Sequence, residues 1–475
     1  MRERARASFS RFLTVVLIVT AFGWADPAIA QNAPAAATDE AKLGALTLAE
    51  AIKLAVANGE SAKIAEANTE AARLTVRESE AGAYPQVTGI VGYTYNINQP
   101  KQEMEFAEAF NPLMQAMGLP PMENPEIPLV YRHDWAMTLD VQQTLAVGRV
   151  SKAIRLAKMY EESSRLGADV TNRDTALETA RAYYDVVLAE EFLKVSQMFL
   201  TLSQNHHDDT KRKYEAGLKS EFDLLQAQAD LAAAAPNVTD MQQRVALAKK
   251  NLLRLVGMPL DREVTCAESF SEETVQTATD AWREEAFSER EELRMLTLGR
   301  QMKRTESNLY FSNMLPAFSA NMAYTYAGQS ITEENDFWPV EDDWNTFWSV
   351  GIQMQWPIFD GLGNWQRGRR ARVEERIAAL NAARTAKGID LEIEQVSTTL
   401  RTAGEKLAAR KEAMQVADRA FHLASVRYEN GLGTALEKMD AKAVWTQARV
   451  AYLQTLYELN VARYQLAHAL GKETW

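Results

Sequence analysis

Hydrophobic residues recur in alternating steps of three and four along much of the chain, which is the spacing of a coiled-coil seam. No proline lies between Pro128 and Pro236, and none follows Pro357. Because proline breaks helix interiors, the sequence predicts long helices at residues 149–215 and 362–429. At ~1.5 Å per residue each would be ~100 Å long. The seam of the second helix is Ile393, Val396, Leu400, Ala403, Leu407, Met414, Ala417, Phe421, Ala424 and Tyr428, interrupted at Arg410.

A shorter helix is predicted to follow each long one, at residues 221–256 and 434–470. Gly217 and Gly431 precede these helices, and glycine readily takes the left-handed conformation that ends a helix. Each pair of helices should therefore form an antiparallel hairpin. In the first return helix we expect a seam of Phe222, Leu225, Ala229 and Ala232, a kink at Pro236, and a resumed seam from Val238 to Leu255.

Ahead of each long helix the period of the pattern changes to two, which is the period of a strand. Four strands are predicted, at about 84–97, 134–145, 316–327 and 344–358. They have the length of membrane-crossing strands, and their aromatic residues gather toward their ends like an interfacial girdle. A soluble hairpin would explain the alternation but not the tryptophans on the apolar face. Because an open sheet cannot cross a membrane, the strands demand two, three or four copies of the chain.

The chain contains one unit of about 200 residues twice. The segment RKYEAGLKSEFDLLQAQADL begins at Arg212, and VRYENGLGTALEKMDAKAVW begins at Val426. This alignment pairs Tyr214 with Tyr428 and Asp223 with Glu437. We assign the repeats to residues 31–256 and 280–475, joined by a linker at 257–279. Such a duplication is typical of a symmetric wall rather than of a catalytic cleft.

The N-terminus predicts an export signal at residues 1–30, with four arginines, an apolar core and the cleavage pattern Ala28-Ile29-Ala30. The formal net charge of -12 argues against a nucleic-acid partner. Cys266 is the only cysteine, so the chain has no disulfide framework. These features together indicate an exported protein of a bacterial envelope.

No motif for enzymatic chemistry is present. The five histidines form no metal-binding pattern, and the sequence contains no phosphate-binding loop or nucleophile motif. We therefore expect no enzyme activity, no cofactor and no metal site. The adjacent His206 and His207 point to different helix faces, and their role stays open. The basic run Arg367, Arg369, Arg370 and Arg372 either contacts lipid phosphate or forms a solvated face.

Over essentially its whole mature length the chain resembles the TolC-type outer membrane efflux proteins. The resemblance is carried by LTLAEAIKLAVANG from Leu46, by the glutamine-to-glycine leads at 142–148 and 355–361, by the two Tyr-x-x-Gly-Leu turns, and by Ala-Leu-Gly at Ala469. It implies a homotrimer in the outer membrane of a Gram-negative bacterium. The fold would be mainly α with a transmembrane β part, in which twelve strands form a β-barrel continued by an α-helical barrel in the periplasm.

The resemblance further implies a passive exit duct of a tripartite efflux or type I secretion system, served by an inner-membrane pump and a periplasmic adaptor. It places an acidic gate at Glu437 and Asp440, with Asp223 as the matching acid of the first turn. Rings of carboxylates attract cations at a constriction. The adaptor would contact the turns at Gly217, Leu218, Gly431 and Leu432.

One position departs from the family pattern. Gly433 stands where the best-known members carry an arginine that holds the tip closed, and Arg427 or Lys438 could substitute for it. The carboxylates have a second interpretation as ordinary helix-start residues that the helix dipole favours. The duct has a rival as well, a non-conducting envelope scaffold or receptor with a plugged barrel. The cargo, whether drug, metal ion or polypeptide, is not determined by the sequence.

Overall fold

The computed structural model describes residues 45–474 except 104, 125, 146 and 331–343. The predicted export signal lies outside this part of the chain. The described residues form two compact units, a strand unit within Ser79–Ser151 and Ser312–Gly361, and a helical unit within Ala41–Glu78, Lys152–Phe311 and Leu362–Trp475. Each unit is described below by itself.

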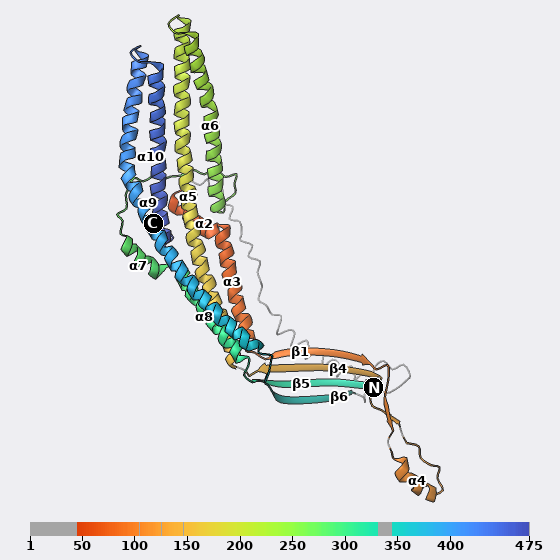
Figure 1. The fold of residues 1–475 in the computed structure, drawn as a ribbon. Helices are drawn as coiled ribbons and strands as arrows, with labels where there is room; N and C mark the ends of the chain where they lie inside the picture. Colours follow the sequence, from red (N-terminus) through yellow and green to blue (C-terminus); the bar gives the residue numbers. More distant parts are fainter. Residues whose placement is uncertain (1–44, 104, 125, 146, 331–343, 475) are drawn as a thin grey trace. The chain divides into compact units, whose positions relative to one another are not determined.

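The strand unit is a four-stranded antiparallel sheet in the order β1-β4-β5-β6 (Figure 1). The strands are β1 (Gln86–Tyr95), β4 (His133–Thr144), β5 (Ala317–Ser330) and β6 (Trp344–Gln355). An excursion between β1 and β4 contains β2 (Lys101–Glu103), α4 (Ala107–Ala116) and β3 (Glu126–Pro128). The sequence predicted the four strands, but it gave no signal for the small elements of the excursion.

The strand register sorts apolar and polar side chains onto opposite faces of the sheet. One row of paired residues is Tyr93, Trp135, Gly328 and Trp344, and the Trp344 ring covers Gly328 so closely that an added Cβ would lie 2.6 Å from it. A row on the other face pairs Thr138 with Thr325, whose hydroxyl oxygens lie 3.1 Å apart. Since alternate residues face opposite sides of a sheet, the sheet has one aromatic, apolar face and one polar face.

The helical unit contains two helical hairpins, α5 (Val147–Glu215) with α6 (Glu221–Leu255), and α9 (Gly363–Glu429) with α10 (Ala435–Ala469) (Figure 1). Each of the four helices begins and ends within two residues of the range predicted from the sequence. Helix α6 is assigned as one continuous helix through Pro236, where the sequence predicted a kink.

The seam predicted for α9 is buried at Ile393, Val396, Leu400, Ala403, Leu407, Ala417 and Tyr428, which confirms it at these positions. We predicted a packed seam at the start of α6, made of Phe222, Leu225, Ala229 and Ala232. This prediction is wrong for the single chain, because all four side chains are exposed. The buried residues of this stretch are Ala227 and Ala234, on the opposite side of the helix. The face with Ala227 and Ala234 is therefore covered by the chain itself, while the predicted seam face remains uncovered.

Four shorter helices complete the described part of this unit, namely α2 (Leu48–Asn58), α3 (Glu60–Ala81), α7 (Thr279–Glu289) and α8 (Glu291–Ser312). The buried Tyr183 hydroxyl donates to the Leu46 carbonyl at 2.9 Å and accepts from the Glu268 amide at 3.0 Å. Asn460 holds the linker by bonding both the amide and the carbonyl of Ser271, at 3.1 and 2.9 Å. Among the described helices, none combines the length and the hydropathy needed to span a bilayer.

Candidate functional site at the helix turns

The turns after α5 and α9 have the same backbone structure. The Leu218 amide bonds the Lys213 carbonyl at 2.8 Å, and the Leu432 amide bonds the Arg427 carbonyl at 2.8 Å. Gly217 and Gly431 have φ values of 73° and 75°, in the left-handed region. This pattern is the Schellman motif, in which glycine is the preferred residue at the left-handed position. The duplicated Tyr-x-x-Gly-Leu sequence thus encodes a duplicated helix stop.

The turns present apolar side chains to solvent. Leu218 is 76% exposed and Leu432 is 74% exposed, and both belong to the set predicted to contact an adaptor. Phe222 and Leu436, one helical turn further on, are also exposed. Sequence analysis placed Phe222 in a coiled-coil seam and assigned neither residue to this surface. We call Leu218, Phe222, Leu432 and Leu436 the tip surface.

Two of the three predicted gate carboxylates take part in helix capping. Glu437 accepts from the Thr434 amide at 3.4 Å while Thr434 accepts from the Glu437 amide at 3.2 Å. Asp223 and Ser220 form the same reciprocal box at 3.1 and 3.2 Å. Hydrogen bonds from Ser220 lower the pKa of Asp223. Asp440 lies exposed in the following turn.

The position of Gly433 brings Arg427 close to the capping carboxylate. The Arg427 guanidinium donates to the Leu432 carbonyl at 3.2 Å and lies 4.0 Å from Glu437 Oε2. A Cβ on Gly433 would lie 3.1 Å from the same Glu437 oxygen and 3.2 Å from the Cβ of Arg427. The glycine therefore leaves room for Arg427 and Glu437 to approach each other within one chain.

A cavity of about 100 Å³ lies between the two hairpins near the turns. Its wall includes the Tyr428 ring. The ammonium groups of Lys219 and Lys438 lie 4.9 and 5.1 Å from the centre of this ring, and the centre of the His206 ring lies 5.5 Å from it. Burial, followed by the charge of Lys438, lowers the pKa of His206. Asp223 lines this cavity, whereas Glu437 and Asp440 do not.

The described residues contain no group of three or more His, Cys, Asp or Glu suited to a metal ion.

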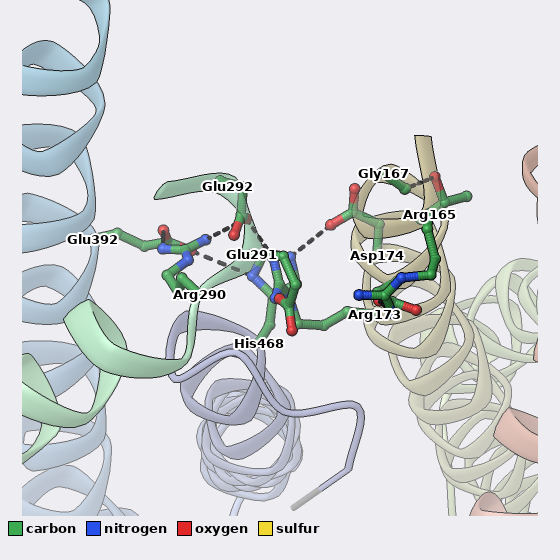
Figure 2. Close-up of polar contacts among 11 residues, drawn as sticks. Arg165, Gly167, Arg173, Asp174, Arg290, Glu291, Glu292, Glu392 and His468 are labelled. Atoms are coloured by element: carbon green, nitrogen blue, oxygen red, sulfur yellow. Dashed lines mark hydrogen bonds and ion pairs between the residues drawn. The ribbon is translucent and has the colours of Figure 1, made fainter. Parts of the chain in front are cut away.

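A second polar cluster, which the sequence did not reveal, joins the hairpins far from the turns (Figure 2). Arg173 of α5 is 2% exposed and bonds Glu291 at 2.5 Å and also Glu292. Arg290, between α7 and α8, bonds Glu292 at 3.2 Å and Glu392 of α9 at 2.6 Å. These residues come from distant segments without a common spacing, so no local pattern could have identified them.

His468 of α10 completes the cluster. Its Nε2 atom lies 2.7 Å from Asp174, and its Nδ1 atom lies 3.4 Å from Glu392 (Figure 2). Burial alone would raise the pKa of Glu392, but hydrogen bonds from His468 and Arg290 lower it to about 2. The cluster therefore links α5 of the first repeat to α9 and α10 of the second through charged groups.

A four-stranded sheet with one apolar and one polar face, together with two equivalent helical hairpins, defines a class of proteins that combine a β part with a duplicated helical part. The family model described as Outer membrane efflux protein matches residues 51–258 and 282–472. The chain therefore belongs to the outer membrane efflux protein family. This is a family of TolC-type efflux and secretion channels of the Gram-negative outer membrane, not of enzymes.

Individual relatives agree with this assignment. The chain is 23% identical over 335 residues to Protein CyaE of Bordetella pertussis, covering 69% of each chain. It is 20% identical over 302 residues to Outer membrane protein TolC of Vibrio cholerae, covering 63% of this chain and 68% of that one. The fold matches the CmeC outer membrane channel of Campylobacter jejuni with a TM-score of 0.71 at 16% identity, covering 89% of this chain and 85% of that one.

Proposed function

We propose that the protein is the outer-membrane exit duct of a tripartite efflux or type I secretion system. The observation that carries this proposal is the two-faced sheet, whose edge strands β1 and β6 each pair on one side only among the described strands. Unpaired backbone groups are too costly in lipid, so the edges require strands from further copies. Three copies, as the family resemblance implies, would close a twelve-stranded barrel with its polar face inside.

The exposed apolar face of α6 supports the same assembly. Phe222, Leu225, Ala229 and Ala232 lie on one side of the helix without cover in the single chain. A helix in the wall of a barrel has a neighbour on each side and needs an apolar stripe for each one. We assign this uncovered stripe to the contact with the next copy, in a helical barrel that continues the β-barrel through the periplasm.

The tip surface is the proposed contact with a periplasmic adaptor. Four large apolar side chains, Leu218, Phe222, Leu432 and Leu436, are exposed at equivalent places of the two hairpins. An inner-membrane pump would supply the energy, since the chain has no nucleotide-binding motif. Passage through the duct itself is then passive, and the cargo is chosen by the pump.

The proposal is tested by recording single channels of the purified mature protein in planar bilayers. A small, cation-selective conductance supports a duct that is held nearly shut. Absence of conductance from folded trimers, both alone and with the tip residues deleted, refutes the duct and favours the plugged scaffold.

The acidic gate is a separate proposal for Glu437 and Asp440. Three copies would bring six carboxylates together at the periplasmic end, where they would attract cations and repel anions. The double variant Glu437→Gln/Asp440→Asn should lower cation selectivity severalfold and raise basal conductance.

Because Glu437 also caps α10, the matched control is Thr434→Ala, which removes the capping box but keeps both carboxylates. Selectivity that changes equally in the control and in the double variant would assign Glu437 to capping alone and remove it from the gate.

A further inference from the structure

The starts of the two long helices break a rule that the other helices follow. A helix N-terminus carries a partial positive charge and favours acidic residues. Acidic residues occupy the first turn of α6 and α10, but none occupies the first turn of α5 or α9. The first turn of α9 is made of residues 363–366, and arginines follow at 367, 369, 370 and 372 before the first acidic residue, Glu374. This end of the helix is therefore strongly basic.

Three of these arginines share one stripe with a tryptophan. Trp365, Arg369, Arg372 and Arg376 follow steps of four, three and four, so they lie on one face of α9 over ~16 Å. The Arg369 guanidinium lies 4.8 Å from the centre of the Trp365 ring, and the Arg372 guanidinium lies 4.8 Å from the centre of the Phe311 ring. We call these four residues the arginine stripe.

Two neighbouring arginines outside the stripe have acidic partners, whereas the ion pairs of the described residues give the stripe none. Arg370 pairs with Glu374 at 3.4 Å, and Arg300 of α8 pairs with Glu375 at 3.4 Å. None of the ion pairs found among the described residues involves Arg369, Arg372 or Arg376, although all three are exposed. Two of the guanidinium groups thus lie against aromatic rings, and all three arginines are accessible to a partner outside the chain.

We infer that the arginine stripe binds the phosphate headgroups of anionic phospholipids on the periplasmic leaflet of the outer membrane. The chain leaves β6 at Gln355 and enters α9 at Gly363, so the stripe follows the proposed membrane strand directly. Tryptophan beside arginine is suited to a membrane interface, because the ring sits among headgroups and the guanidinium bonds phosphate bidentately. This inference rests on the proposed membrane location of the sheet.

The experiment measures binding of a fluorescent phosphatidylglycerol to the full mature protein in neutral detergent micelles. The test variant is Arg369→Gln/Arg372→Gln/Arg376→Gln. The matched control is Arg384→Gln/Arg410→Gln/Arg419→Gln, which removes equal charge from exposed positions further along α9. We expect the test variant to lose about fivefold in affinity per arginine, whereas the control binds as the wild type does. Phosphatidylcholine should bind weakly to all three proteins, and inorganic phosphate should not compete.

Equal binding of phosphatidylglycerol by the test and control variants would overturn the inference, as would displacement by inorganic phosphate, which would mark a free-anion site. A change of channel ion selectivity without a change in lipid binding would place the stripe on the water-filled path and also overturn it. Conductance of the same preparations separates this inference from the proposed duct. Conduction without lipid preference refutes the stripe alone. Lipid preference without conduction, both in the full protein and with the tip residues deleted, refutes the duct alone.

Discussion

Replacing Glu392 with glutamine should destabilise the protein in a pH-dependent way. The Glu392 carboxylate accepts hydrogen bonds within the cluster of Figure 2, and its pKa falls from 4.5 to about 2. A difference of that size corresponds to about 3.4 kcal/mol. Because the side chain is 35% exposed, screening by solvent reduces this contribution, and we expect about 1–2 kcal/mol at neutral pH.

The sign of the pH dependence follows from the lowered pKa. A carboxyl whose pKa is lowered by folding stabilises the folded state at any pH above its pKa in the unfolded chain. This stabilisation is lost as the pH falls to the pKa of the carboxyl in the folded protein. The stability gap between wild type and Glu392→Gln should therefore be complete at pH 7 and shrink to less than half at pH 3. It should fall to roughly a tenth of its full size at pH 2, where half of the folded wild-type carboxyls are protonated, and disappear below that pH.

Urea unfolding in detergent, followed by circular dichroism at pH 7, 4.5 and 3, measures this gap. Glu394→Gln is the matched control, because Glu394 lies on the same helix, is 60% exposed, and approaches Arg283 only to 4.0 Å. That variant should behave as the wild type at each pH. A gap for Glu392→Gln that stays constant between pH 7 and pH 3 would refute the reasoning, since it would show that the charge is not the cause.

Two further predictions concern glycine conformation and the linker. Gly431→Ala should destabilise the folded protein by about 1–2 kcal/mol, because Gly431 has a positive φ. Gly388→Ala should stabilise it by about 1 kcal/mol, because Gly388 lies within α9 and the added Cβ meets open space. Urea unfolding that gives both changes the same sign would contradict this. Asn460→Ala leaves the peptide groups of Ser271 without their partner and should cost about 3 kcal/mol. Limited proteolysis should then cleave within residues 257–278 first, and an unchanged cleavage pattern would show that Asn460 does not hold the linker.

The long helices could be predicted from sequence because their signals are local. An uninterrupted hydrophobic period, missing prolines and the glycines at 217 and 431 place α5 and α9 within two residues of their observed ends. The four strands were found for the same reason, through a change of period from 3.5 to two. Each of these signals is complete within the segment that it describes.

The charged cluster could not be predicted, because its residues have no shared pattern along the chain. Arg173 lies on α5, Arg290 between α7 and α8, and Glu392 on α9, each more than 100 residues from the next along the chain. Their meeting depends on how α5, α8 and α9 pack. The wrong seam at the start of α6 has a related cause. The heptad pattern identified an apolar face correctly as apolar, but it could not tell whether that face meets the same chain or another copy.

The duplication itself misleads at the tip. Tyr214 and Tyr428 are equivalent in sequence, yet Tyr214 is 39% exposed and Tyr428 is 9% exposed. The difference comes from the neighbours of Tyr428, since His206 and Lys438 correspond in the other repeat to Ala420 and Leu224.

Alanine and leucine cannot form the ring and cation contacts that enclose Tyr428. The cavity chemistry is therefore present once per chain although the turns are present twice.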